Sequence, residues 1–198
     1  MTCRTVQGRF LLKPTKDLRS IVIGVLARAQ RLYPVEIHAF VFLSNHYHLL
    51  LSVDSALELA RFMNYLNSNL AREAGRIYGW SEKFWGRRYQ AIVITQEEAA
   101  QVDRLRYLLS HGCKEGLVAR PEEWPGAQCV KALTEGRPLR GRWFDRTKEH
   151  SARSRGEVFH HLKYTSHEEV ELDPLPCWQH LSETDYRRRV GELVSAIE

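Results

Sequence analysis

Residues 35–53 read VEIHAFVFLSNHYHLLLSV, and this stretch decides the fold class. Apolar residues alternate through 35–43, the pair Ser44–Asn45 predicts a tight turn, and residues 46–53 return as a second apolar run. The pattern therefore predicts a β-hairpin. On its first strand, the alternation places these residues on one face: Val35, Ile37, Ala39, Val41 and Leu43.

Helical periodicity lies on both sides of the hairpin. Apolar residues recur every three or four positions in 17–33, 56–76 and 97–109, and each segment predicts an amphipathic helix. Short apolar runs at 5–14 and 89–94 predict two further strands. The order β-α-β-β-α-β-α is that of a ferredoxin-like split β-α-β sheet, so the predicted class is α+β with one helix added at the end of the core.

The composition changes after residue 136. We predict a catalytic domain over residues 1–136 and a C-terminal extension, rich in Arg, His and Pro, over residues 137–198. The Pro-containing segment ELDPLPCW breaks the extension at 171–178, and a terminal helix is expected over about 182–197. We interpret the extension as an appendage without a core of its own.

The charge balance allows an anionic partner without requiring one. Lys and Arg outnumber Asp and Glu by 29 to 24, which gives a net charge of +5 and a pI near 9.1. The four cysteines are scattered without a CxxC pair, which indicates reduced thiols. No apolar run approaches the ~20 residues of a membrane helix, and MTCRTVQGRF lacks the apolar core of a signal peptide. The expected location is the cytoplasm, with no membrane partner.

His46 and His48 place two imidazoles in an otherwise apolar strand. Residues two apart on a strand point to the same face, so the two rings lie side by side while Tyr47 points away. Such a pair suits a metal ion. The alternative is a pair of hydrogen-bonded histidines on a polar sheet face, and this short motif alone favours that alternative.

The helix over 97–109 offers further candidates. Tyr107 and His111 are four positions apart and share a helical face, with Arg104 one turn earlier. If this face meets the hairpin, His111 is a third metal ligand and Tyr107 a nucleophilic hydroxyl. The alternative is a packing role for Tyr107 and a frayed helix end at HGCKEG, where histidine is favoured for electrostatic reasons.

Residues 83–90, KFWGRRYQ, interleave aromatic rings with arginines. Arginine binds phosphates and aromatic rings stack on bases, so the pattern predicts contacts with nucleic acid. The alternative is an amphipathic strand edge with Phe84 and Trp85 in the core. The candidate DNA contacts are Lys83, Trp85, Arg87, Arg88 and Tyr89, together with Arg104.

Taken in order, VFLSNHYHLLLSV, FWGRRYQAIVI, RLRYLLSHGCKEGLV and PEEWPG resemble the REP-associated tyrosine transposases. These are single-tyrosine HUH endonucleases related to insertion-sequence transposases. HUH denotes two histidines around a bulky apolar residue, a pattern that residues 46–48 match. The resemblance covers roughly residues 4–130 and leaves the extension outside.

The resemblance implies a ferredoxin-like enzyme that cuts single-stranded DNA beside a hairpin formed by a palindromic repeat. It implies that Tyr107 forms a 5′-phosphotyrosine link, and that His46, His48 and His111 hold Mg²⁺ or Mn²⁺. Asn45 matches the residue that commonly precedes the first histidine. Both a monomer and a homodimer are compatible with the sequence, and the protein would be nucleoid-associated when bound to DNA.

Three other functions remain compatible with the sequence. A domesticated binder of DNA hairpins would have no need to keep the histidines and Tyr107. A metal-dependent phosphoesterase that uses a water molecule would turn over many times without a covalent protein–DNA species. A structural RNA-binding domain of the same fold would place aromatic rings on the sheet face, where the histidines are expected here.

Overall fold

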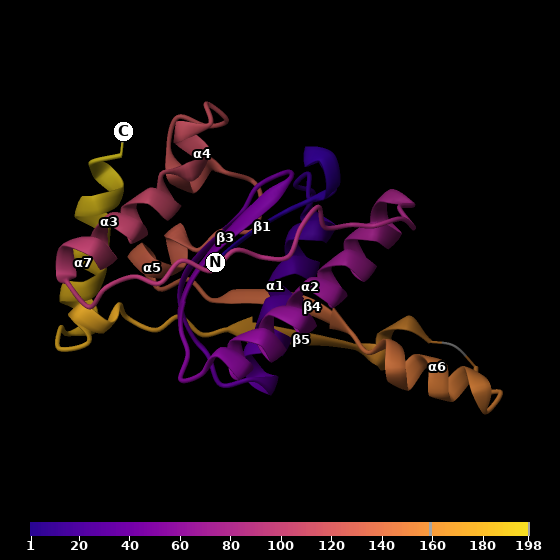
Figure 1. Cartoon of the computed structure of the whole chain (residues 1–198). Coiled ribbons are helices and arrows are strands. Elements are labelled where there is room, and N and C mark those ends of the chain that lie inside the picture. Colours follow the sequence, from indigo (N-terminus) through magenta and orange to yellow (C-terminus); the bar gives the residue numbers. More distant parts are fainter. Residues whose placement is uncertain (159, 198) are drawn as a thin grey trace.

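A three-stranded antiparallel sheet lies at the centre of the computed structural model, which describes residues 1–158 and 160–197 (Figure 1). Its strands are β1 (Thr2–Arg4), β2 (Glu36–Phe42) and β3 (His46–Ser52), in the spatial order β1-β3-β2. Arg4 lies opposite His46, and Thr2 lies opposite His48. Residues directly opposite in a ladder share a face, so β1 extends the face that carries both histidines.

Helices cover both faces of this sheet (Figure 1). The face opposite the histidines packs on α1 (Lys16–Leu32) and α2 (Ala56–Tyr78), which begin where the side chains of Thr15 and Ser55 accept backbone N–H groups. The histidine face is covered by α3 (Glu98–Leu109) and the short α4 (His111–Lys114). None of the described helices combines the length and apolar character that crossing a bilayer requires.

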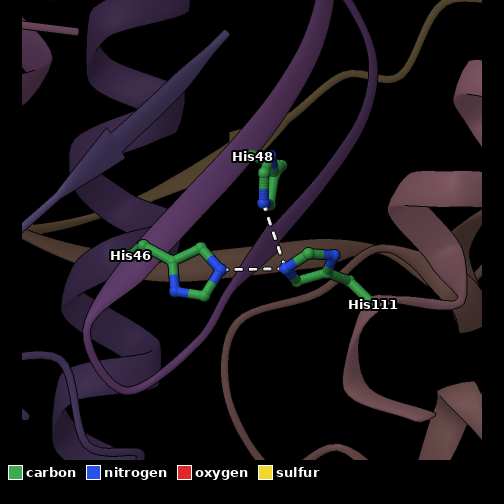
Figure 2. A group of neighbouring side chains, drawn as sticks. All are labelled: His46, His48 and His111. Atoms are coloured by element: carbon green, nitrogen blue, oxygen red, sulfur yellow. Dashed lines mark hydrogen bonds between the residues drawn. The ribbon is translucent and has the colours of Figure 1, made fainter. Parts of the chain in front are cut away.

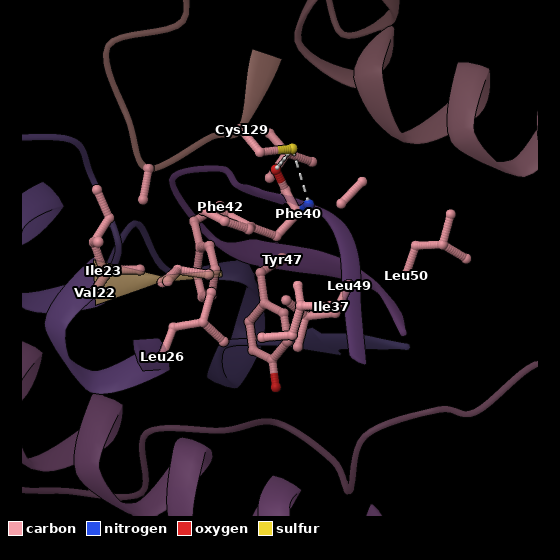
Figure 3. Packing of buried hydrophobic residues seen from close by; sticks show 14 of the residues in the cluster. Val22, Ile23, Leu26, Ile37, Phe40, Phe42, Tyr47, Leu49, Leu50 and Cys129 are labelled. Carbon is pink, nitrogen blue, oxygen red and sulfur yellow. Dashed lines mark hydrogen bonds between the residues drawn. The ribbon is translucent and has the colours of Figure 1, made fainter. Parts of the chain in front are cut away.

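The hydrophobic core lies between the sheet and α1, with Tyr47 at its centre (Figure 3). Tyr47 is fully buried and stacks on Phe42, with ring centroids 4.8 Å apart. Its hydroxyl donates a hydrogen bond of 2.6 Å to Oδ1 of Asn67 in α2. The predicted hairpin and all three predicted helices are confirmed, because periodicity reports which face each element buries.

The predicted alternation along β2 is wrong at one position. Ile37 lies opposite Leu51 and Ala39 lies opposite Leu50, so His38 forms a bulge between them. Because of the bulge, Ile37 and Ala39 point to opposite faces of the sheet. Ile37 lies on the face of Tyr47, whereas Ala39 lies on the face of His48. One extra residue thus moves an apolar side chain from one layer to the other.

The strand predicted over residues 5–14 is also wrong. The strand β1 ends at Arg4, and Val6–Gly8 form a short 3₁₀ turn in which Gln7 has φ 52° and Gly8 has φ 68°. A left-handed backbone conformation cannot continue a strand. Leu11 and Leu12 are nevertheless buried, which explains why this segment reads as apolar.

No regular strand forms over residues 89–94, contrary to the prediction. Residues 85–90 meet residues 2–5 at two isolated bridges, Thr2 with Gln90 and Thr5 with Trp85. Between these bridges the chain advances three residues from Thr2 to Thr5 but five residues from Trp85 to Gln90, so two extra residues interrupt the ladder. Beyond Gln90 the segment has no partner strand within the described residues, and Val93 is 93% exposed.

The outer edge of β2 is covered by residues that follow α3 and α4 in the chain. The N–H of Phe42 donates to the carbonyl oxygen of Ala127 over 2.8 Å. The N–H of Phe40 donates to Sγ of Cys129 over 3.2 Å, and the thiol donates to the carbonyl oxygen of Phe40 over the same distance (Figure 3). Burial raises the pKa of the Cys129 thiol to about 12, so the thiol is protonated and can donate.

The C-terminal extension packs against the same core. The strands β4 (Leu139–Phe144) and β5 (Thr165–Val170) form an antiparallel ribbon on α1, followed in the chain by α7 (Glu183–Ser195), which packs on α5 (Val130–Glu135). The predicted terminal helix is confirmed. The boundary at residue 136 stays a prediction about domain organisation. The remaining elements are α6 (Arg146–Ser154) and the 3₁₀ turns Pro121–Glu123, His161–Tyr164 and Pro176–Trp178.

We expect Gly141→Ala to lower the free energy of unfolding by about 3 kcal/mol. A Cβ at Gly141 would lie 2.2 Å from the backbone nitrogen of Gly24 and 2.3 Å from the carbonyl oxygen of Ser20, so the ribbon would have to separate from α1. Urea unfolding measures the change. As a control, Gly191→Ala in α7 meets no atom within 4 Å and should raise stability by about 0.5–1 kcal/mol. Unchanged stability of Gly141→Ala would contradict this docking of the ribbon.

Candidate metal and tyrosine site

Three histidine side chains meet on the sheet face that α3 and α4 cover (Figure 2). Nε2 of His111 lies 2.8 Å from Nε2 of His46 and 3.2 Å from Nε2 of His48. His46 and His111 are 6% and 5% exposed, and one nitrogen from each of the three rings lies within 4.8 Å of the others. Three imidazole nitrogens directed at one point are a donor set for a divalent metal ion.

Asn45 fixes the orientation of the first ring. Nδ1 of His46 lies 2.6 Å from Oδ1 of Asn45, whose Nδ2 donates to the carbonyl oxygen of Gly8 over 3.1 Å. An amide oxygen accepts a hydrogen, so the proton is on Nδ1 and the lone pair of Nε2 faces the other two histidines. The structure therefore places Asn45 in the supporting position that the sequence predicted.

Burial favours the neutral form of all three imidazoles. Desolvation, followed by the charge of His111, lowers the pKa of His46 from its ordinary 6.5 to about 4 and the pKa of His48 to about 3. Desolvation also lowers the pKa of His111, against the opposing effect of Glu115. The neutral imidazole is the form that binds a metal, so the unprotonated site is ready to accept one near neutral pH.

We expect the metal-free protein to lose stability progressively as the pH falls from about 6.5 to about 4. The unfolded chain binds more protons here, because the pKa values of His46 and His48 are lower in the folded chain. Their contribution is fully present above about pH 6.5 and falls as the pH drops toward the folded values. Urea midpoints in a chelating buffer measure the fall. A double variant, His46→Gln with His48→Gln, should show a smaller fall, and an identical one would assign the titration to other groups.

Tyr107 lies beside the histidines, on the last turn of α3. Its ring centroid is 5.8 Å from that of His48 and 5.2 Å from that of His111. The ring is half-buried and borders two cavities, of about 200 Å³ and 590 Å³. The structure thus brings the predicted nucleophile and all three predicted metal ligands together.

The frayed helix end at residues 111–116, which was the alternative to a site, does not form. α3 ends at Leu109, Ser110 leads into α4, and His111 is the first residue of that helix. The Ser110 hydroxyl donates to the carbonyl oxygen of Tyr107 over 3.1 Å, and this hydrogen bond stabilises the junction between α3 and α4. His111 is consequently a fixed, buried side chain.

Positive charges flank the tyrosine ring. Cζ of Arg104 lies 5.5 Å from the ring centroid, as expected from its place one turn before Tyr107. Nζ of Lys114 lies 4.7 Å from the same centroid, and Arg4 lies opposite His46 on the histidine face. Such cations attract the phosphates of a nucleic acid.

Sequence reasoning missed Arg4 and Lys114. The Lys114 signal was available, since seven residues after Tyr107 is two helical turns along the same face. Arg4 offered no such signal, because its place depends on the register of β1 against β3, which links residues 42 positions apart in the chain.

The five candidate DNA contacts around residue 86 lie on the other side of the sheet. They line a groove of about 1140 Å³ beside α2: Lys83, Trp85, Arg87, Arg88 and Tyr89. Cys3 also borders this groove and lies opposite Tyr47 in the ladder, so the groove belongs to the face away from the histidines. The structure groups these five residues and separates them from Arg104.

The side chains around the groove differ in how far they are exposed to solvent. Trp85 is half-buried, donates its Nε1–H to the carbonyl oxygen of Asn67 over 2.9 Å, and packs edge-on against Tyr47. Phe84 is buried in the core. Arg87 and Arg88 are exposed, and Cζ of Arg88 lies 5.3 Å from the ring centroid of Tyr89. Lys83 is exposed as well, so Lys83, the two arginines and the half-buried Tyr89 form the accessible part of this surface.

Comparisons with known proteins show what this chain is similar to. The family model described as "Transposase IS200 like" matches residues 11–108. The solved structure of the REP-associated tyrosine transposase bound to a REP hairpin has a TM-score of 0.56 and 16% sequence identity, over 68% of this chain and 76% of that chain. At that identity the likeness shows the fold alone. No curated protein matches the chain. The resemblance found in the sequence is confirmed: over residues 11–108 the chain is similar to the IS200-like transposases.

Proposed function

We propose that this protein is a metal-dependent endonuclease and strand transferase for single-stranded DNA, and that it cuts beside DNA hairpins through a 5′-phosphotyrosine at Tyr107. The observation that carries the proposal is the position of the Tyr107 ring beside three converging imidazoles. A tyrosine hydroxyl and a metal-binding set on one surface suit covalent attack on a phosphodiester.

His46, His48 and His111 would hold Mg²⁺ or Mn²⁺, which supplies electrostatic stabilisation of the charge that grows on the scissile phosphate. Oη of Tyr107 attacks phosphorus, an O–P bond forms, and the bond to the 3′ oxygen breaks. The phenolic proton passes to water, and the 3′ oxygen takes a proton from water. The link conserves the bond, so a second 3′-hydroxyl can reverse the step and rejoin strands.

The basic residues form two surfaces, which would bind different parts of the DNA. Arg4, Arg104 and Lys114 would hold phosphates next to the cut, since they lie around the histidines and Tyr107. The groove around Arg87, Arg88 and Tyr89 would hold flanking DNA. The hairpin bound to the similar solved structure supports a hairpin partner here. With DNA as its substrate, the protein would lie in the cytoplasm on the nucleoid.

A covalent trapping experiment tests the proposal. The full chain is incubated with Mn²⁺ and end-labelled single-stranded oligonucleotides that carry hairpins, and the products are run on denaturing gels. We expect a shifted protein–DNA species that a chelator abolishes, with mass spectrometry locating the nucleotide on Tyr107. Multiple turnover without an adduct would instead indicate attack by water, and binding without cleavage would indicate a hairpin binder.

A further inference from the structure

The three histidines leave one requirement of the proposed site unmet. They supply nitrogen ligands alone, and an imidazole set by itself favours zinc and other late first-row ions. Mg²⁺ and Mn²⁺ prefer oxygen ligands, above all carboxylates. A carboxylate within reach of the three nitrogens would therefore decide which ion the site selects.

Glu115 brings a carboxylate close to one of these nitrogens. Its Oε1 lies 3.9 Å from Nε2 of His111, the nitrogen on which the other two imidazoles converge. Glu115 directly follows α4, and its backbone N–H donates to the carbonyl oxygen of His111 over 3.1 Å. The backbone of Glu115 is thus fixed relative to the metal-binding set.

The side chain of Glu115 is free to move toward that set. It is 53% exposed, and within residues 1–158 and 160–197 its carboxylate makes no ion pair except the one with His111. Ligand atoms at neighbouring positions around an octahedral ion lie roughly 3 Å apart, given metal–ligand distances of about 2.1 Å. Oε1 therefore needs to approach Nε2 by about 1 Å, which a small rotation of an exposed side chain provides.

We propose that Glu115 is a fourth protein ligand of the metal ion, and that its oxygen gives the site a preference for Mn²⁺ or Mg²⁺ over Zn²⁺. The proposal rests on the proposed function, in which His46, His48 and His111 hold the ion. It extends that function, because it assigns the preference for Mn²⁺ or Mg²⁺ to Glu115. This residue belongs neither to the pair His46 and His48 nor to α3, the helix that carries Tyr107.

Metal titrations of the full chain without DNA test this role. Isothermal titration calorimetry with Mn²⁺ and with Zn²⁺ compares the wild type, Glu115→Ala, Asp103→Ala and His111→Ala. Asp103 is a matched control, since it is an exposed acid on α3 that borders the Tyr107 cavity but makes no contact with the three histidines. Thermal unfolding of the metal-free variants checks that each is folded.

We expect Glu115→Ala to raise the Kd for Mn²⁺ at least about tenfold and the Kd for Zn²⁺ less than about threefold. Asp103→Ala should change neither value. Because water would replace the lost oxygen ligand, Mn²⁺ bound to Glu115→Ala should also relax water protons faster than Mn²⁺ bound to the wild type.

Three results would overturn the proposal. If Glu115→Ala binds Mn²⁺ as the wild type does while His111→Ala loses it, the site has three ligands and the proposed function stands without Glu115. Equal losses for both ions, with a similar loss in Asp103→Ala, would reveal a general effect of charge. If the wild type binds neither ion, the three-histidine site fails together with this proposal.

Discussion

Tyr107→Phe is expected to abolish the covalent protein–DNA species and to slow cleavage by at least about 1,000-fold. The variant keeps the ring that lies 5.2 Å from His111 and 5.8 Å from His48, and it removes the one oxygen that would attack phosphorus. Single-turnover cleavage of an end-labelled hairpin oligonucleotide with Mn²⁺ measures the loss. Binding of the oligonucleotide should change little, since Arg4, Arg104 and Lys114 are unaltered.

Tyr33→Phe is the matched control for this variant. Tyr33 is a half-buried tyrosine whose ring packs against Tyr65, with centroids 5.7 Å apart, on the face of the sheet away from the histidines. The Tyr33→Phe variant should cleave the oligonucleotide at the rate of the wild type. Cleavage that persists in Tyr107→Phe without an adduct would transfer the role of nucleophile to water.

His46→Ala should abolish cleavage and raise the Kd for Mn²⁺ by at least about 100-fold. The change removes one of three converging nitrogens and leaves His111 with one imidazole partner. Calorimetry measures the metal affinity, and the trapping gel measures the cleavage. His167→Ala, an exposed histidine on the β4–β5 ribbon, should alter neither.

Asn45→Ala separates ligation from orientation. It leaves all three nitrogens in place but removes the oxygen that accepts from Nδ1 of His46, so we expect a loss of about 10- to 100-fold in metal affinity. A loss as severe as that of His46→Ala would mean that the ring cannot hold its position without the amide. Unchanged affinity in both variants would contradict a metal at the histidines.

The elements that bury a continuous apolar face could be predicted from the sequence. The hairpin of β2 and β3, the helices α1, α2 and α3, and the terminal helix α7 all follow their periodicity. Tyr107 and His111 could be paired because four residues bring side chains together along a helical path, and the short break at Ser110 preserves that proximity.

Features that depend on pairing between distant segments could not be predicted. The bulge at His38 reverses the faces of β2, although the local sequence alternates without interruption. The segment at 89–94 has the composition of a strand, but two extra residues opposite β1 prevent a regular ladder. Arg4 reaches the histidines through the β1–β3 register alone. Such properties belong to the partner as much as to the segment itself.

The coverage of the central sheet has a consequence for how the protein behaves at high concentration. Backbone groups of β1 are bonded to Gly86 and Gln90, and those of β2 to Ala127 and Cys129. A strand from another molecule would first have to displace these residues before it found free donors and acceptors. The covered edges therefore protect the sheet from the edge-to-edge pairing through which fibrils grow. The β2–β3 hairpin would otherwise favour fibrils, because it is rich in apolar and aromatic residues.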